Sequence, residues 1–178
     1  MSRSILLAIL ATVLPPSLPA PTTFPAPSAV ATARDMWSAQ MKNITAAAEQ
    51  MTEANYAYQP IATVRTFGQL IGHLAGTQNL ICGTALGEKT GEEGDIEKST
   101  TTKTALVAAL KASNDHCAKA YAMSDADAGK MHNLFGADHT ALWALMQNAV
   151  HDAEHYGNIV TYMRMLGMVP PSSQQAAR

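Results

Sequence analysis

Two histidines spaced four residues apart are the first candidates for chemistry. The segment HDAEH begins at His151 and ends at His155. On an α-helix this spacing places the two imidazoles about 40° apart around the axis and about one turn apart along it, so both rings can reach one divalent ion. The spacing by itself fits a solvated pair equally well. A metal site therefore needs at least one more ligand from another part of the chain.

His73 is the best candidate for that third ligand. It lies in an apolar segment, residues 67–85, and its neighbours include Gly72, Leu74 and Gly76. A lone histidine in an apolar helical stripe is more often a hydrogen-bonded core residue than a ligand. Small neighbours permit close helix approach, which shifts the balance toward a ligand only slightly. The other histidines, His116, His132 and His139, are expected at the surface or in connectors.

Residues near the three histidines could assist them, although surface solvation or ordinary packing explains each one at least as well. Asp152 or Glu154 could orient a ligand imidazole from outside the metal site. Tyr162 shares the histidine face of the last predicted helix, and Gln78 or Asn79 could line a pocket beyond His73. None of them is assigned a catalytic role.

Four amphipathic helices are predicted to position these residues. Apolar residues make up 47% of the chain and aromatics only 6%, a surplus of Ala, Leu and Met that favours helices over strands. Thr66 and Gln69 have the spacing of a capping box, and Gly87 and Gly167 are expected helix ends. The predicted spans are 30–51, 67–85, 99–121 and 138–166, with no credible strand. These features predict an all-α four-helix bundle.

The first 29 residues differ from the rest and are interpreted as a signal peptide followed by a Pro-rich disordered leader. Ile5–Leu14 is an apolar run too short to span a bilayer comfortably, and it follows Arg3. Cleavage is expected after Ala20 or at a later site, AVA at 29–31 or ATA at 31–33, and an uncleaved tether is the alternative. The folded domain is expected over residues 30–171, with a disordered tail over 172–178. The mature protein is therefore expected in the periplasm or secreted, without a membrane span.

Export would make the two cysteines candidates for a disulfide. Cys82 and Cys117 each lie near the end of a predicted helix, and an oxidising compartment makes an even pair a disulfide candidate. Two free buried thiols are the alternative. The net charge of −2 and the lack of a basic run exclude nucleic-acid binding as the main activity.

Several short motifs, taken in order, resemble the DinB-like (YfiT-like) superfamily over residues 30–171. They are YAYQP at 56–60, RTFGQLIGHLA at 65–75, HDAEHYG at 151–157, YMR at 162–164 and GMVPP at 167–171. The resemblance implies a four-helix bundle whose metal is held by one histidine of the second helix and an H-x-x-x-H pair of the fourth. In this sequence these positions are His73, His151 and His155.

Three neutral histidines leave coordination positions open for water or for a small-molecule substrate, as in catalytic sites. Imidazole ligands suit zinc and nickel best, with iron and manganese as further options. Hydrolysis and sulfur transfer both fit such an ion. Characterised DinB-like relatives include thiol transferases and a thiol-dependent isomerase, so the resemblance favours sulfur transfer, whereas export argues against it because reduced thiol pools are cytoplasmic. The alternative is a noncatalytic, stress-associated bundle in which the ion is structural, with homodimerisation through an apolar helix face.

Overall fold

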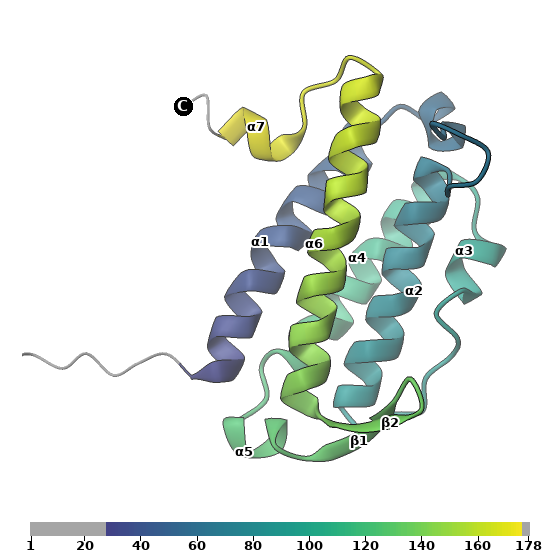
Figure 1. Cartoon of the computed structure of the whole chain (residues 1–178). Helices are drawn as coiled ribbons and strands as arrows, with labels where there is room; N and C mark the ends of the chain where they lie inside the picture. Colours follow the sequence, from purple (N-terminus) through teal and green to yellow (C-terminus); the bar gives the residue numbers. More distant parts are fainter. Residues whose placement is uncertain (1–27, 176–178) are drawn as a thin grey trace, which may run out of the picture.

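The computed structural model describes residues 28–175, which form a helical bundle with one small β-hairpin at its end (Figure 1). The all-α class predicted from the sequence is confirmed. In chain order the elements are α1 (Ala29–Gln50), the 3₁₀ helix η1 (Ala54–Ala57), α2 (Phe67–Ala85), α3 (Asp95–Ser99), α4 (Lys103–Ala120), α5 (Asp125–Ala128), β1 (Met131–Leu134), β2 (Ala137–Thr140), α6 (Ala141–Met165) and α7 (Pro171–Gln175).

The four long helices do not simply alternate in direction. Helices α1 and α6 run one way, whereas α2 and α4 run the other (Figure 1). Helix α2 packs against both α4 and α6, and α1 packs mainly against α6. The start of α4 lies beside the end of α1: Lys103 Nζ donates hydrogen bonds to the carbonyls of Glu49 and Met51 at 2.8 and 2.6 Å. Residues 86–102 therefore connect the end of α2 to the start of α4 by running along the length of α2, and this connection contains α3.

The predicted helix signals are present. Thr66 Oγ1 accepts from Gln69 N at 3.1 Å, and Gln69 Oε1 accepts from Thr66 N at 2.8 Å, which completes the capping box of α2. Gly87 and Gly167 follow the ends of α2 and α6 with φ of 74° and 72°. This left-handed conformation is costly for residues with a Cβ, so glycine is favoured at both helix ends.

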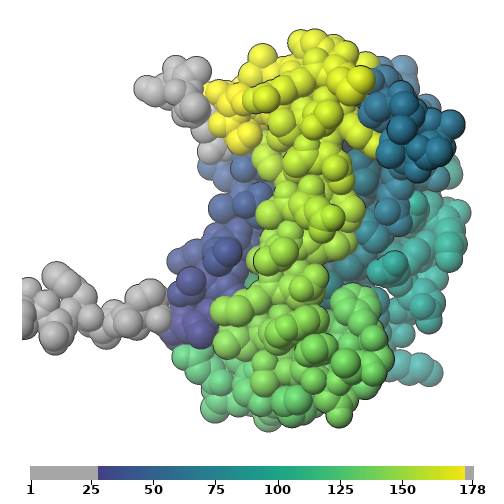
Figure 2. All heavy atoms as spheres, viewed as in Figure 1, coloured from purple at the N-terminus to yellow at the C-terminus, as the bar shows by residue number. Residues whose placement is uncertain are grey.

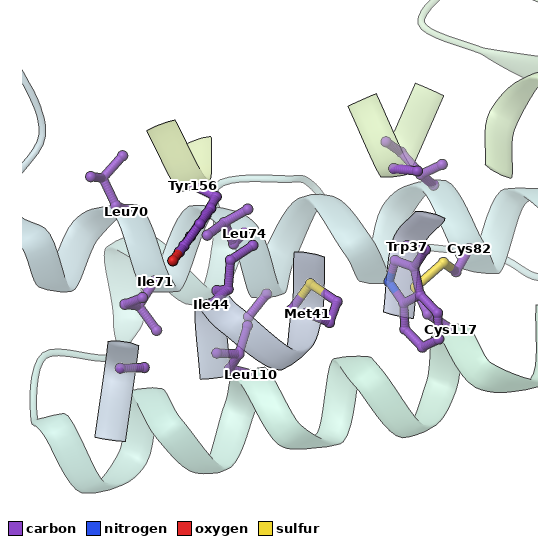
Figure 3. Packing of buried hydrophobic residues seen from close by; sticks show 14 of the residues in the cluster. Trp37, Met41, Ile44, Leu70, Ile71, Leu74, Cys82, Leu110, Cys117 and Tyr156 are labelled. Atoms are coloured by element: carbon purple, nitrogen blue, oxygen red, sulfur yellow. A yellow bond between two sulfur atoms is a disulfide. The ribbon is translucent and has the colours of Figure 1, made fainter. Parts of the chain in front are cut away.

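The hydrophobic core fills the space between the four long helices (Figure 3). Trp37 of α1 stacks on Tyr121 with ring centroids 4.6 Å apart. The indole Nε1 of Trp37 donates to Gln78 Oε1 at 2.9 Å, so the polar end of this large side chain is satisfied inside the core. Ile44 and Leu110 are fully buried nearby. The amphipathic faces predicted from the sequence thus meet in one core.

Cys82 and Cys117 form a disulfide that joins α2 to α4 (Figure 3). Their Cα atoms are 5.2 Å apart, within the usual range for a disulfide. Both residues are fully buried. Of the two alternatives left open by the sequence, the structure contains the disulfide.

The prediction that a helix begins near Asp138 and that the chain has no strand was wrong. Strands β1 and β2 form an antiparallel hairpin, and His139 lies on β2 instead of on the helix. The turn is formed by Phe135 and Gly136, both with positive φ, 55° and 82°, as a two-residue hairpin turn requires. Helix α6 begins only after Thr140, whose side chain caps it.

The C-terminal segment is also more ordered than expected. A disordered tail was predicted from residue 172, but Pro171–Gln175 form α7, and only residues 176–178 lie outside the described part. Ser172 N donates to Tyr156 Oη at 3.0 Å, and Tyr156 Oη donates to Ser172 Oγ at 2.9 Å. These long-range contacts stabilise a helix that is too short to form alone.

The leader prediction falls mostly outside the described residues, since these begin at 28. Ala20, after which cleavage is expected, and the apolar run Ile5–Leu14 both lie there. The two later candidate cleavage sites, at 29–31 and 31–33, fall inside α1, where Val30 and Ala33 are buried in the core. Within the described residues, no helix combines the length and apolar character needed to cross a bilayer.

Candidate metal centre

The fold brings the three predicted histidines together. His73 lies on α2, and His151 and His155 lie one turn apart on the facing side of α6. The Nε2 atom of His73 is 3.1 Å from the Nε2 atom of His151 and 3.1 Å from that of His155. Among the described residues, these three form the group whose side-chain donors could hold a metal ion.

Hydrogen bonding between the rings does not explain this convergence. A neutral imidazole nitrogen carries either one proton or one lone pair, so His73 Nε2 can form a full hydrogen bond with only one of its two neighbours. Three nitrogens bound to one tetrahedral ion at about 2.05 Å would lie about 3.3 Å apart. The two separations from His73, both 3.1 Å, are close to that value, and all three donor atoms lie within 4.8 Å of one another. The donor set therefore fits a divalent ion.

Two of the three rings, His73 and His155, also have a polar partner on the side away from the other histidines. His73 Nδ1 lies 3.5 Å from Thr77 Oγ1 and 3.8 Å from Glu97 Oε2, and His155 Nδ1 lies 3.2 Å from the Asn158 side-chain amide. An imidazole that binds a metal through Nε2 carries its proton on Nδ1. Asn158 accepts that proton once its amide is turned to present Oδ1.

Comparison with protein families matches residues 36–159 to the DinB superfamily. The chain belongs to the DinB superfamily. The matched segment contains all three histidines of the site. This confirms the resemblance noted in the sequence and agrees with the bundle described above.

Solved structures show the same fold at low sequence identity. A DinB-like protein from Bacillus cereus ATCC 10987 superimposes with a TM-score of 0.68 at 17% identity, over 78% of this chain and 93% of the other. The DinB-like protein YjoA from Bacillus subtilis gives 0.62 at 16%, over 78% and 94%. A mycothiol-dependent maleylpyruvate isomerase gives 0.56 at 16%, over 75% and 65%. A comparison with curated proteins gives no match.

The environment of the site keeps the imidazoles of His73 and His155 neutral. Burial lowers the pKa of His73 from 6.5 to about 3, and the nearby Arg65, His151 and His155 lower it further. Burial, followed by His151 and Arg65, lowers the pKa of His155 to about 4. Metals bind the neutral imidazole. His73 and His155 therefore have the protonation state that metal binding requires at neutral pH, without first losing a proton.

Asp152 lies directly behind His151. Its side chain is fully buried, and burial raises the pKa of its carboxyl group to about 6, against the opposing effect of His151. Asp152 Oδ2 accepts from Asn148 Nδ2 at 3.2 Å. Asp152 Oδ1 lies 3.9 Å from His151 Nδ1, and both atoms are buried without a hydrogen-bond partner among the described residues. A shift of under 1 Å would close this contact, giving a carboxylate that orients a ligand imidazole. Of the two acids proposed from the sequence, Asp152 takes this position and Glu154 is exposed.

Glu97 reaches the site because α3 packs tightly on α2. A Cβ added at Gly72 would lie 2.8 Å from the Cα of Glu97, which is closer than real Cβ atoms come to such a neighbour. The close approach expected from the small residues around His73 thus exists, although its partner is α3 and not a long helix. Glu97 was missed from the sequence because it lies in an acidic segment that was expected to be an irregular connector.

A cavity of about 870 Å³ opens beside the histidines, between α6 and the loop that precedes α2. In Figure 2 this loop is the blue segment at the upper right, next to the yellow-green surface of α6. The cavity is lined by the loop 59–65, Gln69, Leu70, Glu97, His155, Asn158 and Tyr162. The imidazole of His155 therefore faces a space large enough for a small molecule.

The helper residues predicted on α2 do not line this cavity. Gln78 is buried and bonds to Trp37 and to Ser113, while Asn79 contacts His116. Tyr162 lines the cavity as its place on the histidine face suggested. Arg65 and Asn158, which also line it, were missed as functional residues.

Proposed function

We propose that this protein binds a divalent metal ion, zinc or nickel before iron or manganese, through His73, His151 and His155, and uses it in a transfer or hydrolysis reaction. The convergence of three Nε2 atoms beside an open cavity carries the proposal, with those of His151 and His155 each 3.1 Å from that of His73. Closed structural sites usually have four protein ligands, whereas catalytic sites keep a position free. Within the described residues, the group contains three.

An ion held there would act as a Lewis acid that lowers the pKa of a bound thiol or water molecule. The protein's own residues would hold the ion, orient its ligands and shield the reacting groups from solvent. Neutral His73, His151 and His155 bind the ion, while Asp152 and Asn158 hold two of the rings in place. The cavity wall formed by Leu70 and Tyr162 excludes part of the solvent from the reacting groups.

Sulfur transfer and hydrolysis are the two candidate reactions. One structural neighbour is a mycothiol-dependent isomerase, which favours a thiol as the co-substrate. The disulfide Cys82–Cys117 favours an oxidising compartment, where reduced low-molecular-weight thiols are scarce. We propose export to the periplasm or beyond on the basis of the N-terminal leader and this disulfide. A fusion of residues 1–35 to a reporter that is active only after export tests it, and an inactive fusion would refute it.

A noncatalytic role is the second candidate. An ion bound by His73 and the α6 pair would join α2 to α6, the pair of helices that lines the site. If the ion is structural, chelation should unfold the bundle or lower its melting temperature by tens of degrees, because the binding free energy becomes folding free energy. If it is catalytic, the metal-free protein should stay folded.

Metal content is the direct test. We expect purified wild-type protein to hold one equivalent by elemental analysis, and His73→Ala and His151→Ala to hold none. His139→Ala is the matched control, because His139 stacks on Trp143 away from the triad with ring centroids 3.6 Å apart. Retention of a full equivalent in His73→Ala and His151→Ala would overturn the assignment. Protein isolated from its native compartment should be analysed as well, because recombinant loading follows metal availability.

A further inference from the structure

We propose that Arg65 forms an anion-binding subsite beside the metal centre, so that the natural ligand carries a carboxylate a few atoms from the group that approaches the ion. This inference rests on the proposed metal-binding function and names the class of molecule that the site accepts. Arg65 and His155 both line the cavity between α6 and the loop 59–65. A ligand in that cavity can contact both.

The charge of the cavity favours an anion. Among the described residues that line it, Arg65 and Glu97 are the charged ones, and they form an ion pair with Arg65 Nε 3.0 Å from Glu97 Oε1. These two charges offset each other. A divalent ion on three neutral histidines would then leave the cavity with a net positive charge, which attracts anionic ligands and disfavours cationic ones.

The guanidinium of Arg65 is held in place while its outer end stays accessible. Its side chain is 40% exposed and hydrogen-bonded through Nε to Glu97, whereas its two Nη atoms have no hydrogen bond to any residue in the described part of the chain. Tyr162 Oη donates to the Arg65 carbonyl at 2.8 Å and fixes the backbone. Two Nη donors in a fixed plane match a carboxylate, which they bind through two parallel hydrogen bonds.

Glu97 also connects the subsite to the metal centre. One of its carboxylate oxygens contacts Arg65, and the other lies 3.8 Å from Nδ1 of His73. A single carboxylate group therefore separates the guanidinium from a ligand imidazole. This proximity places the anion-binding group and the ion within reach of one small molecule.

Part of the cavity wall is apolar. Ile61 and Val64 on the loop are 61% and 40% exposed, and both face the cavity with Pro60 and Leu70. Hydrocarbon in the ligand would cover part of these side chains. The ligand class is therefore a small carboxylate with a short apolar body and a sulfur or oxygen donor at its other end.

The proposal can be tested by thiol binding to the cobalt-substituted full chain, which needs no turnover. The probes are 3-mercaptopropionate and 3-mercaptopropan-1-ol, which share the thiol and the chain length but differ in the carboxylate. The cobalt–sulfur charge-transfer absorption gives a dissociation constant for each. We expect the wild type to bind the carboxylate probe about ten- to a hundredfold more tightly, the ratio expected for a charged hydrogen-bonded contact.

Two substitutions localise the preference. Arg65→Gln should remove it while leaving the affinity for the alcohol unchanged, and Arg65→Lys should keep only part of it because the charge remains but the planar fork is lost. Arg164→Gln is the matched control, since Arg164 is on α6 but bonds to Ser173 outside the cavity. It should behave as the wild type. Cobalt stoichiometry and melting temperature are measured for every variant.

Each result bears on the proposal. Equal binding of the two probes by the wild type, or an unchanged preference in Arg65→Gln, would overturn the anion subsite while leaving the metal site intact. Equal binding by the wild type overturns the subsite without any variant, and Arg65→Lys serves as the second variant if Arg65→Gln fails to fold. If cobalt binds but no thiol changes its spectrum, the open metal centre and the subsite are both wrong. If His73→Ala retains cobalt, the metal assignment itself fails.

Discussion

The disulfide between Cys82 and Cys117 should supply a measurable part of the stability of this bundle. The change to make is its reduction, which leaves both sulfur atoms in the fully buried positions they already occupy and so removes the cross-link without removing packing. The double variant Cys82→Ala, Cys117→Ala is the control, since reductant should have no effect on it. Both proteins are compared free of metal, because bound metal would stabilise the fold independently.

The magnitude follows from the length of chain that the disulfide closes. The two cysteines are separated by 35 residues, and the loop-closure entropy lost by the unfolded chain corresponds to about 3.8 kcal/mol at 25 °C. For a domain of about 150 residues, this difference corresponds to a melting temperature lower by about 8–15 °C.

Urea and thermal unfolding followed by far-ultraviolet circular dichroism measure the effect. The protein is reduced while unfolded, refolded under reductant and compared with the oxidised form, with mass spectrometry to confirm the thiol state. Cys82 follows His73 by nine residues, about 14 Å along the helix, so metal stoichiometry should be the same in both forms. A melting temperature that changes by less than 3 °C, or that falls equally in the alanine variant, would refute the reasoning.

Three further outcomes are expected. The fold lowers the pKa values of His73 and His155 to about 3 and 4, so the unfolded chain binds more protons than the folded protein below pH 6.5. The free energy of unfolding of metal-free protein, measured by urea titration, should therefore fall as the pH is lowered from 6.5 to 4. Asp152, with its pKa raised to about 6, has the opposite effect, but it is one group against two. Asp152→Asn should weaken zinc binding about 10- to 100-fold in a competition assay with a chelator, and unchanged affinity would contradict its orienting role. Gly72→Ala should displace Glu97 and lower stability by about 1–3 kcal/mol, whereas Gly157→Ala, with open space around it, should not destabilise the fold.

The connection between the ion pair and the metal centre gives the site a means of selecting its ligand. Arg65 contacts Glu97, and Glu97 in turn lies beside His73. A carboxylate that binds the Nη atoms of Arg65 would share the guanidinium with Glu97, which holds it through Nε. In the proposed site, ligand binding and the electrostatic environment of the ion would therefore be coupled through Glu97.

Local sequence determined the features that depend on residues within a few turns of each other. The spacing of His151 and His155 fixes their common face on α6, and the Thr66 capping box fixes where α2 begins, because both depend on helix periodicity and backbone hydrogen bonds. Apolar periodicity likewise predicted the four long helices. The two-residue turn before α6 was missed because a glycine preceded by phenylalanine is a weak hairpin signal.

Contacts between distant residues were decided only by the tertiary structure. His73 and His151 are 78 residues apart in the sequence, and Arg65 and Glu97 are 32 apart, yet each pair is in contact. No local sequence pattern predicts these contacts, because they depend on how α2, α3 and α6 pack. The pairing of Cys82 with Cys117 depends in the same way on α2 and α4 running in the same direction. The sequence thus determined which residues could act as metal ligands. The packing of α3 against Gly72 determined that Glu97 and Arg65 lie beside them.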